Sequence, residues 1–206
     1  HAGASIEAYR DYLDPQYRAD FDAWRGSYKN PAKSHVGSKK SKNWDSQERL
    51  SDLLRDGVVG EVVFPNTVPP FYDAAFHASP QRYKHQLAGS RAHNRWLADF
   101  CAEQPARRAG IGLIHLNNID DAIEDVQWIA KHNLRGGVLL PLPSPSEVHL
   151  HPLNHPGYDR LWAAIQDCDL VINQHSGQGS PTYDGGQGSK ALWAMEMPFF
   201  IQRGFT

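Results

Sequence analysis

A chain of 206 residues with 40% apolar and 21% charged residues has the composition of a globular protein, which excludes an intrinsically disordered segment. Its 21 Lys and Arg nearly balance its 23 Asp and Glu, which argues against nucleic acid as a partner. No run approaches the ~18 consecutive apolar residues of a membrane span, so we expect no membrane partner either.

The N-terminal residues and the cysteines indicate the cellular compartment of the protein. The first residues, HAGASIEAYR, lack the order of basic, apolar and small residues that marks a secretory signal. Cys101 and Cys168 lie far apart and outside any CxxC spacing, so we expect reduced thiols. Together these features predict a cytoplasmic protein.

Short β-branched runs alternate with amphipathic helical patterns over most of the chain. The expected strands are GVVGEVVFPNT, AGIGLIHL, GGVLLP and DLVINQH, at residues 57–67, 109–116, 136–141 and 169–175. Apolar stripes predict helices at residues 90–104, 120–133 and 158–169, and a further helix over 190–205. Continuous apolar strands of this kind are typical of a parallel sheet that is covered on both faces.

Three segments interrupt this alternation. Residues 29–44 carry five lysines without helical phase and are interpreted as a basic surface loop. Residues 68–86 are interpreted as an inserted loop. Residues 176–190 contain five glycines directly after a strand, and such a loop lets the backbone approach a ligand closely. We therefore expect residues 176–190 to form an active-site loop.

The strand spacing favours a barrel. Strands that start near residues 58, 109, 137 and 170 are 51, 28 and 33 residues apart, and a (β/α)₈ barrel uses roughly 31 residues per unit. A doubly wound sheet shows the same alternation, but no Gly-rich phosphate turn follows the first strand. With a further strand at the very N-terminus, we predict an α/β fold: one incomplete TIM-barrel domain over residues 1–206, with about the first five strands.

His175 ends the fourth of these strands, where the active sites of parallel α/β folds assemble. Its position alone leaves a core histidine and a functional group equally open. At other strand ends, Asn66 could donate to a substrate oxygen or cap a turn, and His115 is interpreted as a residue of a helix interface. Arg91 could bind an anionic substrate or form a salt bridge at a helix terminus. HLHPLNH, residues 149–155, has metal-like spacing but lies in a proline-rich loop.

Four stretches carry a family resemblance: VVFPNTVPPF, AGSRAHNRWLADFCAEQPARRAGIGLI, NLRGGVLLP and NHPGYDRLWAAIQDCDLVINQHSG. They resemble the amidohydrolase-related family that includes aminocarboxymuconate semialdehyde decarboxylase. The resemblance covers about residues 57–203. It implies a metal-dependent (β/α)₈ barrel with a divalent ion, most often Zn²⁺, with Mn²⁺ or another first-row ion as alternatives.

The resemblance also implies site residues. His175 matches the family's metal ligand at the fifth strand, and His1 matches the second member of the first-strand pair, whose partner would precede residue 1. The family's sixth-strand histidine and eighth-strand aspartate have no counterpart, so we expect a fragment whose catalytic residues lie beyond residue 206. Asn66, Arg91 and Ser176 are the expected substrate-binding residues.

The resemblance favours decarboxylation of a small carboxylated organic substrate. Hydrolysis of an amide, ester or lactone would use the same metal site. A non-catalytic ligand-binding α/β domain is a second alternative, and a scaffold for partner proteins is disfavoured because the glycine-rich loop would be costly to order without a ligand. We expect the 206-residue chain alone to be inactive. Homo-oligomerisation of the complete protein stays open.

Overall fold

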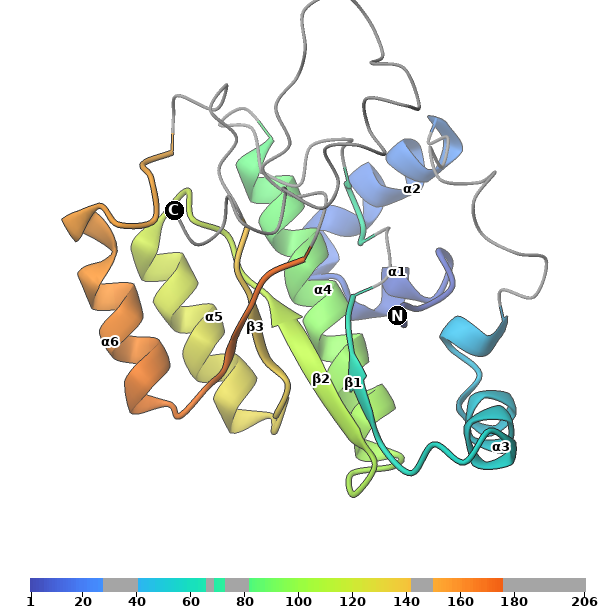
Figure 1. The fold of residues 1–206 in the computed structure, drawn as a ribbon. Helices are drawn as coiled ribbons and strands as arrows, with labels where there is room; N and C mark the ends of the chain where they lie inside the picture. Colours follow the sequence, from blue (N-terminus) through green and yellow to red (C-terminus); the bar gives the residue numbers. More distant parts are fainter. Residues whose placement is uncertain (28–40, 66–68, 73–81, 142–149, 176–206) are drawn as a thin grey trace, which may run out of the picture.

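A parallel sheet forms the centre of the computed structural model, which describes residues 1–27, 41–65, 69–72, 82–141 and 150–175 (Figure 1). Its four strands are β1 (Glu61–Val63), β2 (Arg108–Leu113), β3 (Gly137–Leu139) and β4 (Ile172–Asn173). They lie side by side in the order β1-β2-β3-β4, and each neighbouring pair is parallel. Since the order never reverses, the sheet follows the topology of a barrel and not that of a doubly wound fold.

The N-terminal segment extends the sheet beyond β1. Ala2 forms a parallel bridge with Pro65, and the Ala2 amide donates to the Phe64 carbonyl at 3.0 Å. The strand predicted at the very N-terminus is therefore a single bridge within the described residues. It nevertheless sets His1 at the carboxyl end of the sheet, beside the residues that follow β1.

Three helices stand in a row against one face of the sheet: α4 (Tyr83–Ala102), α5 (Ile119–Lys131) and α6 (Asp159–Asp167) (Figure 1). Two glycines of β2 allow their close approach. A Cβ on Gly110 would lie 2.9 Å from Cys101 Sγ of α4, and a Cβ on Gly112 would lie 2.4 Å from Ile129 Cδ1 of α5. The strand sequence AGIGL is thus matched to the helices that cover it.

The opposite face of the sheet is less covered. In β1, Val63 is fully buried whereas Val62 is 58% exposed, and alternate residues of a strand point to opposite faces. Val171, directly before β4, is 59% exposed. In a closed barrel the face opposite the helices lines the interior, which explains why apolar side chains occupy it.

The described residues before β1 form three α-helices that the sequence pattern did not predict. They are α1 (Tyr9–Tyr12), α2 (Arg18–Ser27) and α3 (Ser46–Arg55). Short 3₁₀ turns at Pro15–Tyr17 and Ser41–Asn43 lie between these helices, and another at Pro156–Tyr158 precedes α6. The Asp45 side chain accepts from the amides of Gln47 and Glu48 and so caps α3, whereas α1 is a single turn held by its packing on α4.

The prediction of an inserted loop over 68–86 is wrong at its end, because α4 begins at Tyr83 and not at Ser90. Gly89 lies in the second turn of this helix. In the structure a Cβ on Gly89 would lie 1.9 Å from the Pro70 carbonyl oxygen, so this glycine lets the residues around Pro70 lie directly on the helix. The strands are also shorter than predicted, although each lies within its predicted range except β2, which begins one residue earlier.

Several other predictions fall on residues that the structure does not describe. The glycine-rich loop at 176–190 and the helix over 190–205 lie entirely outside them, and so does most of the basic segment 29–44. Among the described residues, no helix combines the length and the apolar character needed to cross a bilayer. Cys101 and Cys168 are both free thiols.

Candidate metal centre

Two histidines from opposite ends of the described chain meet at the carboxyl end of the sheet. His1 precedes the bridge beside β1, and His175 follows β4 by two residues. Their Nε2 atoms lie 3.3 Å apart, and their rings are nearly perpendicular, at 82°, with centroids 5.0 Å apart. The curvature of the sheet thus brings together side chains that are 174 positions apart in the sequence.

The orientation of the His1 ring is fixed by its other nitrogen. Nδ1 lies 3.0 Å from the Pro65 carbonyl oxygen, which can only accept a hydrogen bond. Nδ1 therefore carries the hydrogen, and in the neutral ring Nε2 presents its lone pair towards His175. Metal-binding histidines characteristically donate their second ring nitrogen to a carbonyl or carboxylate in this manner.

The distance between the two Nε2 atoms suits a shared divalent ion. Imidazole nitrogens bind Zn²⁺ at about 2.0–2.1 Å, and two such ligands in tetrahedral geometry stand about 3.3–3.4 Å apart. Phe64 flanks both rings, with its centroid 5.8 Å from that of His1 and 5.4 Å from that of His175. Two imidazoles do not complete a site, and the described residues contain no group of three or more His, Cys, Asp or Glu side chains suited to hold a metal.

Arg91, a predicted substrate-binding residue, lies in the middle of α4 and faces α5. Its Nε donates to Asp125 Oδ1 at 2.7 Å, and its Nη2 donates to Glu124 Oε2 at 2.8 Å. Asp121 is a third carboxylate, 3.7 Å away. The salt-bridge alternative accounts for these contacts, but as a bond between two helices and not at a helix terminus.

The remaining predicted residues divide into those described and those not. Asn66 and Ser176 lie outside the described residues. His115 is buried, and its Nε2 lies 2.8 Å from Ser90 Oγ of α4, as expected for a residue of a helix interface. In the segment 149–155, His151 and His155 stack with ring centroids 3.9 Å apart, and His155 Nδ1 accepts from the Gly157 amide. His155 thus acts as a cap.

The sequence pattern alone did not identify His93 and Asn94, two residues of α4 that form hydrogen bonds to neighbouring elements. His93 Nδ1 bonds to the Tyr9 hydroxyl of α1 at 2.8 Å. Asn94 bonds twice to the backbone of Leu113 at the end of β2, at 2.8 and 2.9 Å. His93 and Asn94 share a helical stripe with Leu97 and Phe100, so the sequence indicates that they are buried. Because buried polar side chains require partners, this pattern could have identified both residues.

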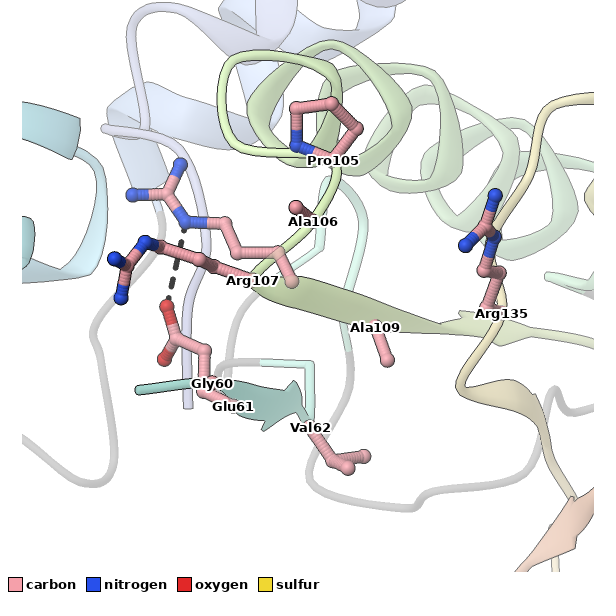
Figure 2. A pocket seen from close by; sticks show the side chains of 9 residues that line it. Gly60, Glu61, Val62, Pro105, Ala106, Arg107, Ala109 and Arg135 are labelled. Carbon is pink, nitrogen blue, oxygen red and sulfur yellow. Dashed lines mark hydrogen bonds and ion pairs between the residues drawn. The ribbon is translucent and has the colours of Figure 1, made fainter. Parts of the chain in front are cut away.

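A separate hollow of about 330 Å³ opens at the amino end of the sheet, away from the histidine pair. It lies at the start of β1 and β2, between Arg107 and Arg135, and Val62 borders it (Figure 2). Because sites of parallel α/β folds form at the carboxyl ends of the strands, this hollow is not the candidate centre.

Comparison with solved structures identifies the fold. A 2,6-dihydroxybenzoate decarboxylase from Rhizobium matches with a TM-score of 0.53 at 20% identity, over 76% of this chain and 49% of its own. The 5-carboxyvanillate decarboxylase LigW from Sphingomonas paucimobilis matches with a TM-score of 0.57 at 17% identity, over 98% and 60%. A dihydroxybenzoic acid decarboxylase from Polaromonas sp. JS666, with bound manganese and 2-nitroresorcinol, gives 0.54 at 16%, over 89% and 55%.

These matches confirm the predicted fold class, an α/β partial barrel with a parallel sheet. The fold is also the one that the resemblance in the sequence motifs implies. This chain spans about half to three fifths of the length of these enzymes. No protein-family model and no curated protein sequence matches the chain.

Proposed function

We propose that this chain forms part of a divalent-metal-dependent enzyme of the amidohydrolase-related type, with His1 and His175 as two of the metal ligands. The observation that carries this proposal is the approach of their Nε2 atoms to 3.3 Å, with His1 Nδ1 bonded to the Pro65 carbonyl. That arrangement leaves a lone pair aimed at the second imidazole, which is the geometry of a shared ion.

The residues around the pair suit a small organic substrate. A bound divalent ion would act as a Lewis acid towards a substrate oxygen. Phe64 supplies an apolar wall beside both imidazoles. Asn66 and Ser176 directly follow elements of the site in the sequence, and we propose that they contact the substrate. Arg91 has no such support, because its guanidinium group is engaged by carboxylates of α5.

The reaction that we propose is decarboxylation of a carboxylated aromatic compound. The fold matches three decarboxylases, and two of them are described as acting on dihydroxybenzoic acids. One of the three holds manganese, so we propose Mn²⁺ beside Zn²⁺ as the metal. The remaining ligands would come from the strands that complete a barrel, since an ion of this kind needs three or four protein ligands. On this proposal, residues 1–206 are one incomplete domain of a cytoplasmic enzyme.

Metal analysis tests the proposal most directly. The complete protein, with the strands that close the barrel, should retain close to one ion per chain after loading with Mn²⁺ or Zn²⁺ and desalting, and His175→Ala should lose most of it. His132→Ala is the matched control, because this exposed histidine bonds to the Trp128 carbonyl on the outer face of α5. Equal metal retention in the wild type and in His175→Ala would contradict the proposed centre.

Substrate assays separate the alternatives. Release of carbon dioxide from 2,6-dihydroxybenzoate or 5-carboxyvanillate by the longest available form of the protein, and its loss in His175→Ala, would support decarboxylation. Turnover of aryl esters or lactones with the same dependence on His175 would favour a hydrolase. Binding of these compounds without turnover, and without metal, would favour a non-catalytic ligand-binding domain.

A further inference from the structure

Arg49 of α3 connects three parts of the chain beside the candidate metal centre. Its Nε lies 3.0 and 2.9 Å from the two carboxylate oxygens of Glu61 in β1. Its Nη1 donates to the carbonyl of His1 at 3.2 Å and to the carbonyl of Lys42 at 3.1 Å. One guanidinium group therefore bonds both to the first residue and to the strand that pairs with it.

The ion pair between Arg49 and Glu61 is largely buried, and a second arginine also contacts Glu61. The side chains of Arg49 and Glu61 are only 16% and 9% exposed. Arg108 of β2, whose side chain is 1% exposed, brings a second guanidinium group to the same carboxylate at 3.3 Å. A rigid guanidinium fork held by a buried carboxylate has few alternative positions. Arg49 thus presents its Nη1 to the His1 carbonyl from a fixed place.

His1 is held at three points, two of which lie just after β1. The amide of the next residue, Ala2, donates to the Phe64 carbonyl at 3.0 Å, and the His1 ring donates to the Pro65 carbonyl at 3.0 Å. Arg49 provides the third, at the His1 carbonyl. Because the carbonyl oxygen and Cα of His1 lie in the same peptide plane, this bond limits movement of the Cα that carries the imidazole.

We infer that Arg49 is a positioning residue, which orients His1 so that its Nε2 faces His175 as a metal ligand. This inference rests on the proposed function for the identity of the metal, but the orientation itself can be observed without it. Glu61 holds the Arg49 guanidinium group in place and therefore contributes to the orientation of His1. Removing a contact of this outer layer typically weakens metal binding by about 10–100-fold.

The first test measures metal affinity. Arg49→Lys keeps the charge beside Glu61 but cannot reach the carboxylate and both carbonyls at once, so we expect Co²⁺ to bind at least about tenfold more weakly. Affinity is read from the visible absorption of bound Co²⁺, whose band shape also reports the ligand geometry. Arg10→Lys is the matched control. Arg10 makes a similar forked bond with Asp22, at 2.9 and 3.0 Å, but does not contact His1 in that bond. It should bind Co²⁺ as the wild type does.

The second test needs no metal. Ring-nitrogen NMR of ¹⁵N-histidine protein should show His1 fixed with its hydrogen on Nδ1, and Arg49→Lys should convert it into a mixture of tautomers. Glu61→Gln, which keeps the side-chain shape, should shift the same signals partway, and circular dichroism verifies that each variant is folded. If Arg49→Lys leaves both the Co²⁺ affinity and the His1 tautomer unchanged, Arg49 has no positioning role.

The two tests distinguish a failure of the proposed metal centre from a failure of the positioning role of Arg49. A complete wild-type protein that binds no Co²⁺ but shows the tautomer shift in Arg49→Lys would overturn the proposed metal centre and leave the positioning role of Arg49 intact. A wild-type protein that binds Co²⁺ through His175, with no effect of Arg49→Lys in either test, would overturn the role of Arg49 alone.

Discussion

The Tyr9 hydroxyl and His93 Nδ1 lie 2.8 Å apart in the core, although 84 residues separate them in the sequence. Both side chains are almost fully buried, at 2% and 0% exposure. The Tyr9 hydroxyl also accepts from the amide of Ala4, so this bond ties the segment that follows His1 to α4. Burial lowers the pKa of His93 to about 3 and raises the pKa of Tyr9, which keeps both groups neutral over the usual pH range.

The depressed pKa of His93 predicts a loss of stability in acid. The unfolded chain binds a proton at this residue below about pH 6.5, whereas the folded protein resists protonation until about pH 3. The contribution is therefore complete above pH ~6.5 and declines as the pH falls, by up to about 1.4 kcal/mol per pH unit. Urea unfolding at several pH values measures it.

His93→Gln should reduce this dependence. Its free energy of unfolding should fall less steeply than that of the wild type between about pH 6 and 4, whatever its stability at pH 7.5. His132→Gln, which changes an exposed histidine of α5, serves as the control and should follow the wild-type slope. Parallel curves for His93→Gln and the wild type would contradict the buried neutral state.

Asp125 predicts a pH dependence of the opposite sign. Burial raises its pKa to about 6, against the opposing effects of Arg91, which lies 2.7 Å from Oδ1. The folded state then keeps a proton that the unfolded state releases near pH ~4, so this contribution is present below pH ~4 and is lost as the pH rises through about 6. Asp125→Asn should thus gain stability relative to the wild type across that interval. A constant difference between their urea midpoints would contradict the raised pKa.

The sequence predicted features that depend on local pattern and missed those that depend on distant partners. The parallel strands and the position of His175 at a strand end follow from apolar runs and their spacing, whereas the family resemblance places His1 beside the first strand. Both histidines lie at strand ends in the structure. Nothing near Tyr9 or Arg49 in the sequence identifies His93 or His1 as their partners, because these contacts arise only when α1 and α3 fold back onto the sheet.

Asn94 should be among the most sensitive positions of α4. Its amide group bonds to both the N–H and the C=O of Leu113, and the residue is only 2% exposed. Asn94→Ala removes both bonds from the part-buried backbone of Leu113, and each lost bond costs up to about 1–3 kcal/mol. Asn118→Ala, which removes the exposed N-cap of α5, should cost only about 1 kcal/mol. Similar losses of unfolding free energy in the two variants would contradict the buried clamp.

Gly89→Ala should destabilise the protein although alanine favours helices. A Cβ at Gly89 would lie 1.9 Å from the Pro70 carbonyl oxygen, and this is a backbone atom that cannot rotate aside. Either the residues around Pro70 or the helix must therefore shift, and overpacking of this kind typically costs about 1–3 kcal/mol. Gly26→Ala in α2 is the matched control, because nothing lies within 4 Å of its Cβ position. There the intrinsic helix preference should act alone and stabilise the protein by up to about 1 kcal/mol. Opposite shifts of the thermal midpoint in the two variants are the expected result, and a rise in both would show that the close contact at Gly89 is absent in solution.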